Sequence, residues 1–159
     1  MTVGMSGHRK LQPAAASWLH DTILFEISRR MVTAGVSSLA VGADQLFVQA
    51  LVEKSIPYCA VIPSQGYQST FDASERSSYE RYLQRADAVI ELDFPGPSEA
   101  AYLAAGKFIV NSVEMLFAAW DGRAARGLGG TGDIVEYAKE TGKPVIHFDV
   151  ETLEVKEIR

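Results

Sequence analysis

The sequence has few of the residues that build metal and redox centres. Its single cysteine, Cys59, excludes an internal disulfide and lies in an apolar run typical of a packed core. The histidines, His8, His20 and His147, lack the spacing of metal ligands, so we expect no metal ion and no cofactor. The Gly-Lys-Ser/Thr ending of a P-loop and the nucleophile elbow of serine hydrolases are missing too, which excludes both classes.

Long apolar stretches and an excess of basic residues are also absent. No apolar run approaches membrane-spanning length, and the N-terminus has neither the basic nor the apolar region of a signal peptide. Lys and Arg total 15 against 20 Asp and Glu, a net charge of −5, which argues against a general nucleic-acid binder. We therefore expect a cytoplasmic protein with no membrane and no nucleic-acid partner.

Short apolar runs alternate with amphipathic segments along the 159 residues, which suit one domain spanning 1–159. Apolar runs predict strands at 2–5, 38–41, 58–62, 88–92, 114–120 and 145–148, and alternation predicts a short edge strand at 153–158. Helical spacing predicts helices at 13–34, from about 44, from 72, at 99–110 and at 131–141. Gly35 marks the end of the first, Asp72 and Glu75 are spaced like a capping box, and Ser98 can cap the helix that follows it. Repeated strand–loop–helix units imply a mainly parallel sheet with right-handed crossovers.

The segment 120–138 joins a buried strand to a helix through a loop with glycines at 122, 127, 129, 130 and 132. Glycine lets bare backbone approach a ligand, and the unpaired N–H groups of a helix N-terminus attract anions. We interpret Gly129, Gly130 and Thr131, the expected helix cap, as part of a phosphate or nucleotide site. The alternative is a flexible loop with an ordinary cap.

Other unusual side chains also follow expected strands. Gly7, His8 and Arg9 follow the first strand, Gly42 and Asp44 follow the second, and Tyr67 lies in the loop after the third. Carboxyl ends of parallel strands meet at one edge of the sheet, where ligands of open α/β sheets bind. We therefore expect these residues to line one cleft.

Each of these side chains has a specific interpretation. Arg9 suits a phosphate clamp because its planar guanidinium matches phosphate, the alternative being a solvated arginine. His8 is either a structural hydrogen-bonding residue or a ligand contact that titrates near neutral pH. Asp44 is most simply a helix N-cap, with a ligand hydroxyl as the second interpretation. Tyr67 either stacks on a base or covers its loop.

Asp121 and Asp133 are carboxylates beside an expected phosphate site, where a bound phosphate would repel them. Either could accept from ribose hydroxyls or act on a glycosidic bond, so they are the catalytic candidates if the protein is an enzyme. Asp133 also has a structural alternative, since an acid in a helix's first turn stabilises the helix dipole by roughly 0.3–1 kcal/mol without a ligand.

Together these motifs resemble the SLOG superfamily, named for DNA-processing protein A and the Lonely guy proteins. The matching segments are Ser6–Arg9, Gly42–Asp44, Lys107–Val110, Trp120–Gly122 and Gly129–Thr131. The resemblance implies a Rossmann-like fold and a nucleotide-type ligand at the carboxyl edge. Within it, the chain looks closest to a small branch with Gly-His-Arg, Trp-Asp-Gly and Gly-Gly-Thr motifs.

Comparison with the Lonely guy loop, Pro-Gly-Gly-x-Gly-Thr-x-x-Glu, gives specific expectations. Lonely guy enzymes hydrolyse the N-glycosidic bond of nucleoside monophosphates, with that glutamate and an arginine on the preceding helix. Here Lys107 stands near the place of the arginine, Ile134 takes the place of the glutamate, and Asp133 comes one position early. One residue turns a side chain by about 100 degrees around a helix, which disfavours the same chemistry.

We therefore predict a Rossmann-like three-layer α/β/α domain that binds or senses a nucleotide-derived ligand, as bacterial SLOG sensors of nucleotide signals do. The alternative is a Lonely guy-like N-glycosidic hydrolase or transferase, and a DNA-binding relative of DNA-processing protein A ranks third. Analogy to the superfamily and the apolar helices 13–34 and 98–110 predict a homodimer or higher oligomer.

Overall fold

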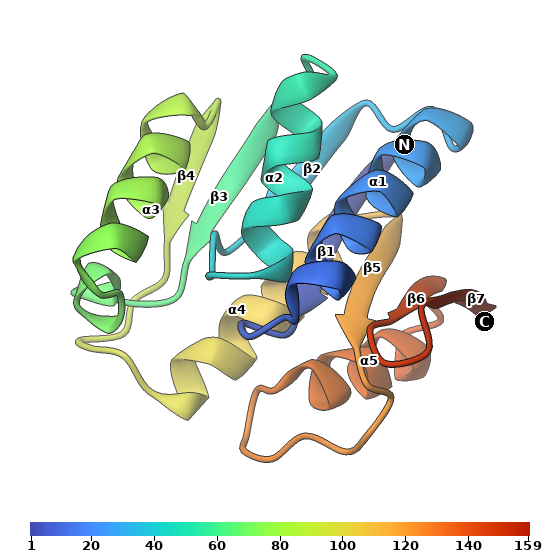
Figure 1. Cartoon of the computed structure of the whole chain (residues 1–159). Coiled ribbons are helices and arrows are strands. Elements are labelled where there is room, and N and C mark those ends of the chain that lie inside the picture. The colour runs from blue at the N-terminus through green and yellow to red at the C-terminus, as the bar shows by residue number, and fades with distance from the viewer.

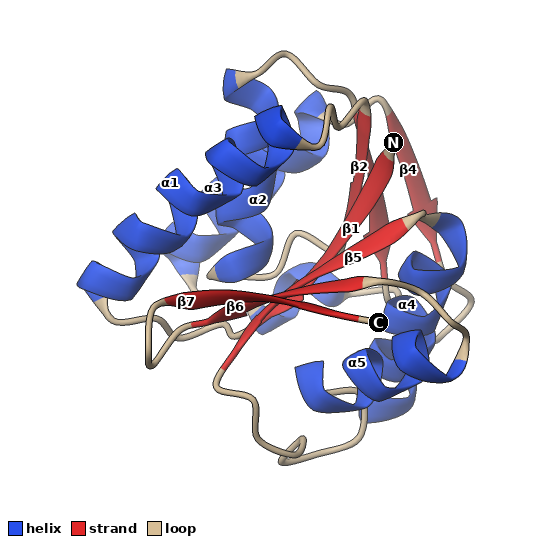
Figure 2. Ribbon diagram, turned by 90° about the vertical axis from the view of Figure 1, so that its right-hand side faces the viewer, coloured by secondary structure: helices blue, strands red, loops and turns tan.

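The computed structural model describes residues 1–159 and contains one seven-stranded sheet between two layers of helices (Figures 1 and 2). The strands are β1 (Thr2–Gly7), β2 (Ala34–Ser37), β3 (Tyr58–Ile62), β4 (Ala88–Glu91), β5 (Met115–Trp120), β6 (Val145–Asp149) and β7 (Glu154–Ile158). The helices are α1 (Pro13–Arg29), α2 (Ala43–Glu53), the short 3-10 helix η1 (Tyr67–Thr70), α3 (Ala73–Arg85), α4 (Glu99–Ser112) and α5 (Thr131–Glu140). The predicted α/β class and three-layer architecture are confirmed.

The strand order is β4-β3-β2-β1-β5-β6-β7, and only β7 runs antiparallel to its neighbour. From β1 the chain moves outward through β2, β3 and β4, then returns to the other side of β1 with β5. The order therefore reverses between β1 and β5, which pair from Val3↔Met115 to Gly7↔Ala119. This reversal opens a crevice at the carboxyl ends of the two strands.

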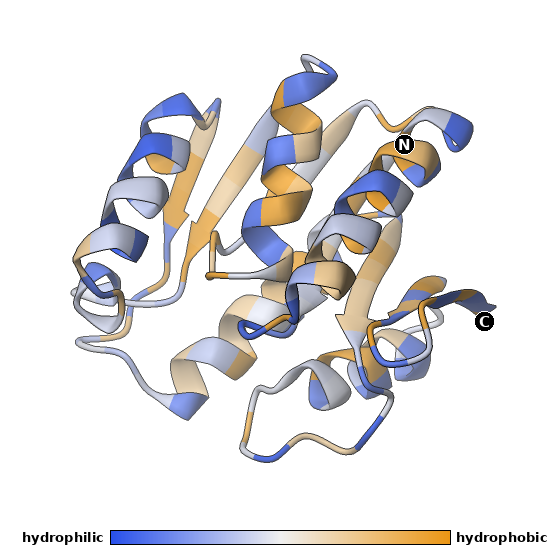
Figure 3. Ribbon diagram, viewed as in Figure 1, coloured by the Kyte–Doolittle hydropathy of each residue, from blue (hydrophilic) through white to orange (hydrophobic).

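The burial pattern explains the layers. Helices α1, α2 and α3 cover one face of the sheet, and α4 and α5 cover the other (Figure 2). Central strand β5 is buried along its whole length, as both faces are covered. Apolar residues lie along the strands and on the inward faces of the helices, and hydrophilic residues lie on the outward faces (Figure 3). No helix has both the length and the apolar character needed to cross a bilayer.

Two predicted boundaries near the second strand are wrong. β2 occupies Ala34–Ser37 while 38–41 is a loop, and α1 ends at Arg29 rather than at 34. Gly35, expected to stop the helix, lies in β2, where an added Cβ would come 2.2 Å from Leu51 Cδ1. The glycine thus lets α2 pack closely on the strand. The run 38–41 resembles a strand because Leu39 is fully buried, but Leu39 packs from a loop with φ of 59°.

The predicted helix caps divide into two groups. Asp72 and Glu75 form the expected capping box, and Ser98 caps α4 by accepting from the Ala101 N–H at 3.1 Å. Asp44 and Thr131 are not caps: they lie inside the first turns of α2 and α5, whose N-caps are Gly42 and Gly130. Neither of these two helices has a side-chain cap. The Ala43 N–H at the start of α2 donates to the His8 carbonyl, whereas the first-turn N–H groups of α5 stay available to other partners.

Candidate functional site

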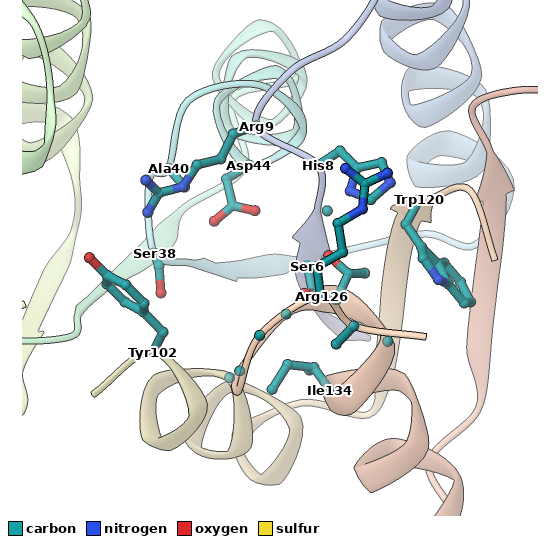
Figure 4. Close-up of a pocket in the computed structure, with 18 of the residues that line it drawn as sticks. Ser6, His8, Arg9, Ser38, Ala40, Asp44, Tyr102, Trp120, Arg126 and Ile134 are labelled. Carbon is teal, nitrogen blue, oxygen red and sulfur yellow. The ribbon is translucent and has the colours of Figure 1, made fainter. Parts of the chain in front are cut away.

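A cleft of about 680 Å³ lies at the carboxyl ends of β1, β2 and β5, where the strand order reverses (Figure 4). The loops after β1 and β2 form one wall, and the glycine-rich loop before α5 forms another. One face of α4 forms the floor. Its volume lies within the range of small-molecule and cofactor sites, and its position is the usual one for an open α/β sheet.

The loop after β1 is fixed by its backbone. The His8 N–H donates to the Ala119 carbonyl at 2.9 Å, and the His8 carbonyl accepts from the Ala43 N–H at 3.1 Å. Gly42 has φ of 85°, and an added Cβ there would come 2.4 Å from the His8 carbonyl oxygen. Gly42 therefore allows the loop after β2 to pack closely against the loop after β1. Gly42 does not line the cleft, whereas Gly7 does. The contact places Arg9 at the cleft wall.

Cations without acidic partners gather in this cleft of an acidic protein. Arg9, Lys10 and Arg126 line it and form no salt bridge, whereas Arg123 pairs with Glu151 at 3.2 Å. The Arg9 guanidinium lies over the Tyr102 ring, with 5.5 Å from Cζ to the centroid. Such unpaired cations produce a positive local potential that favours an anionic ligand.

The glycine-rich loop is held by its own backbone and by Asp133. Gly129, at φ of 82°, donates its N–H to Asp133 Oδ2 at 2.9 Å, and the Gly130 N–H donates to the Gly127 carbonyl at 3.2 Å. Thr131 and Gly132 line the cleft at the start of α5. No side chain caps α5, and uncapped helix N-termini are suited to anions.

Asp133 and Lys107 lie differently from the positions that the sequence suggested. Asp133 does not line the cleft, and its carboxylate is engaged by Gly129. Lys107 points away from the cleft, with its Nζ 4.9 Å from the centroid of the Tyr137 ring. Asp133 and Lys107 stand near the catalytic glutamate and arginine of the Lonely guy pattern, but here they contact the protein itself and not the cleft.

His8 and Asp121 meet at the β1–β5 edge of the cleft. His8 Nε2 lies 3.2 Å from the Asp121 N–H and 3.5 Å from Asp121 Oδ2. Burial raises the pKa of Asp121, but the Arg123 amide and the nearby His8 and Arg123 side chains lower it more, so the net pKa is below the ordinary value. Asp121 is therefore ionised at neutral pH, and it holds the start of the glycine-rich loop by accepting from the Arg123 N–H at 3.0 Å.

Asp44 is buried at the β2 end of the cleft and is only 5% exposed. Burial raises the pKa of its carboxyl group to about 7, although the Ala40 and Ser38 amides, the Ser37 hydroxyl and the Arg9 charge act in the opposite direction. An acid with this pKa changes protonation near physiological pH.

Tyr67 and Tyr102 both line the cleft but differ in exposure. Tyr67 is buried, with edge contacts to Phe71, Tyr79 and Tyr102, so its faces are not open to a ligand base. Tyr102, which the sequence analysis did not single out, is only partly buried and lines the cleft. Its signal was the spacing of Glu99, Tyr102, Ala105, Gly106 and Ile109, which share one face of α4.

Comparisons with known proteins support the fold. No protein-family model matches the chain, and no curated protein matches its sequence. DNA processing protein A from Streptococcus pneumoniae matches with a TM-score of 0.67 and 18% identity, over 92% of this chain and 49% of that one. The Helicobacter pylori protein, described for its single-stranded DNA binding mode, matches with 0.66 and 16%, over 92% and 64%.

The molybdenum cofactor binding protein from Rippkaea orientalis also matches, with a TM-score of 0.58 and 18% identity, over 92% of this chain and 74% of that one. The chain spans between about half and two thirds of the two DNA processing proteins. These similarities show that the chain has the same fold as DNA processing protein A, one of the proteins for which the superfamily resembled by its motifs is named.

Proposed function

We propose that this protein binds a phosphorylated, nucleotide-type ligand in the cleft between β1 and β5 and acts as a binding or sensing module. The observation that carries the proposal is the uncapped N-terminus of α5 in the same cleft as Arg9 and Arg126, which form no salt bridge. Helix N-termini and arginine forks are both suited to phosphate, and here they share one cleft.

Three further features support the same ligand class. The cleft volume of about 680 Å³ accommodates a nucleotide-sized molecule. Tyr102 offers an aromatic surface on α4, which lines the same cleft as the glycine-rich loop. Among the proteins with this fold, one is a molybdenum cofactor binding protein, so the fold can hold a small ligand.

The direct test is a thermal-shift and calorimetric comparison of nucleoside 5′-monophosphates with the matching nucleosides. A ligand at about 100 times its Kd adds roughly 2.7 kcal/mol, or about 5–10 °C in Tm for a chain of this size. If the phosphorylated compounds never bind more tightly than the nucleosides, the phosphate site does not exist. A single-stranded oligonucleotide that binds more tightly than every mononucleotide would favour the DNA-binding alternative.

Arg9→Ala assigns the phosphate contact within this test. Its matched control is Arg81→Ala, because Arg81 lies over Tyr82 at 5.2 Å, as Arg9 lies over Tyr102, but does not line the cleft. Arg9→Ala should weaken nucleotide binding by roughly 10- to 100-fold, as expected for a charged hydrogen bond, and weaken nucleoside binding much less. The control should bind both normally, and equal losses for both ligands in Arg9→Ala would remove Arg9 from the phosphate site.

One observation favours an N-glycosidic hydrolase as a second candidate: the carboxylates of Asp121 and Glu99 line the cleft. An ionised carboxylate against the sugar could stabilise the positive charge that develops when the base departs. We nevertheless expect binding without turnover, since Asp133 is engaged by Gly129. Release of free base from nucleoside monophosphates, abolished in an Asp121→Asn or Glu99→Gln variant that still binds, would establish the hydrolase.

A further inference from the structure

The β2 end of the cleft contains an acid that the phosphate site does not explain. Asp44 lies in the first turn of α2, lines the cleft and is almost completely buried. A carboxylate here would repel a nearby phosphate, so a role in binding requires that it meet a hydrogen-bond donor on another part of the ligand. This inference rests on the function proposed above.

Asp44 has polar neighbours at the end of β2. The Ser37 hydroxyl of β2 and the Ala40 and Ser38 amides of the following loop act on its carboxyl group. An ionised carboxylate offers about four acceptor positions, and Asp44 lines the cleft, where a ligand donor can reach it. The Ser38 hydroxyl is a second polar group at this end.

The surrounding side chains enclose this position. In Figure 4 the Asp44 carboxylate, the Ser38 hydroxyl and the Arg9 guanidinium lie at one end of the cleft, with Tyr102 next to Ser38. The α5 N-terminus, which packs at β5 and β1, lies one to two strands away from the end of β2. Asp44 and the α5 residues Thr131 and Gly132 line the same cleft, so one ligand can contact both.

We propose that Asp44 and Ser38 form a sugar subsite that selects a ribonucleotide over the 2′-deoxyribonucleotide. One hydroxyl of the ribose 2′,3′-diol donates to Asp44, and the adjacent hydroxyl bonds to Ser38. The phosphate of the same ligand occupies the α5 N-terminus and Arg9. The ligand class is therefore a 5′-phosphorylated ribonucleoside.

The protonation of Asp44 gives this subsite a pH dependence. The groups that face it are Arg9 from the loop after β1, Tyr67 from η1 and the donors of its own loop. With a pKa of about 7, the carboxyl group is largely protonated at pH 6 and largely ionised at pH 8. An ionised carboxylate accepts hydrogen bonds at both oxygens, whereas a protonated carboxyl group uses one oxygen as a donor. A ribose hydroxyl that donates to Asp44 therefore favours the ionised form. Ribonucleotide binding should therefore release protons near neutral pH.

The test measures the Kd of ribonucleoside and 2′-deoxyribonucleoside 5′-monophosphates with the same bases at pH 8 and pH 6. The parent should prefer the ribonucleotides by roughly 10- to 100-fold at pH 8, as for one hydrogen bond to a charged group, and less at pH 6. Asp44→Asn should bring the ratio close to one at both pH values. Ser38→Ala should lower the ratio by several-fold without changing its pH dependence.

Arg126→Ala is the matched control, because Arg126 lines the cleft but is not among the groups that act on Asp44, so the variant should weaken both series equally and leave their ratio unchanged. Tight but equal binding of the two series by the parent would overturn the subsite while leaving the phosphate site intact. A preference among bases that disappears in Asp44→Asn would assign Asp44 to the base and also overturn it. If neither series binds, the proposed function itself fails.

Discussion

Replacing Asp44 by asparagine should change how the stability of the unliganded protein depends on pH. Asparagine resembles a protonated carboxyl group in shape and hydrogen bonding. The pKa of Asp44 is raised from 3.8 to about 7 in the folded protein because the group is buried. Between these values the folded state holds a proton that the unfolded state has lost, so stability falls as pH rises from about 4 to 7.

Integrating this linkage gives a loss of roughly 2.5 kcal/mol between pH 5 and pH 8 from Asp44 alone. For a chain of 159 residues, that loss corresponds to about 5–10 °C in Tm. Asp44→Asn should therefore lose much less stability than the parent over this interval, and should be the more stable protein at pH 8. Urea unfolding of both proteins at pH 5, 6, 7 and 8 measures the difference, in which the other titrating groups cancel. Parallel pH profiles would show that Asp44 keeps an ordinary pKa and would refute the argument from burial.

Three other predictions concern the loops and the assembly. Gly42→Ala should destabilise the protein by at least about 2 kcal/mol, seen as a lower urea midpoint, because its φ of 85° is strained for alanine and the Cβ would press on the His8 carbonyl. Asp133→Ala should weaken nucleotide binding by roughly tenfold, because Gly129 loses the acceptor of its N–H. Asp133→Asn keeps an acceptor and should bind nearly normally. Equal effects of the two variants would contradict a role of Asp133 in positioning the loop. Sedimentation at micromolar concentration should detect a homodimer, favoured by Phe25, which is 61% exposed on α1, and a monomer alone would count against it.

Much of the fold was predictable because local patterns and tertiary structure agree. The continuous apolar run of β5 and the capping box at Asp72 both specify their elements locally. The apolar run 38–41 misled the prediction because burial of a loop produces the same pattern as a strand. Gly35 misled it as well, since a glycine needed for packing against Leu51 resembles one that ends a helix.

The convergence of loops on one cleft was predictable from the order of the elements, but individual contacts were not. Parallel strands bring Arg9, Asp44 and the glycine-rich loop to one edge whatever the details of their loops. Whether Asp133 faces the ligand or accepts from Gly129 depends on the loop's backbone conformation, which no spacing in the sequence encodes. The raised pKa of Asp44 likewise arises from burial by residues distant in the sequence.

Several features of the cleft are unfavourable in the unliganded protein, and one ligand would relieve them together. The α5 N-terminus lacks a side-chain cap, and a cap contributes about 1 kcal/mol. Arg9 and Arg126 line the cleft without forming a salt bridge, and Asp44 is buried with a raised pKa. Local rules are broken mostly at functional sites, where stability is sacrificed for binding. A phosphate would satisfy the helix and the arginines, and a sugar hydroxyl of the same ligand would stabilise the ionised form of Asp44. The same molecule thus answers each unfavourable feature, which is the strongest physical reason to seek the ligand among phosphorylated ribonucleosides.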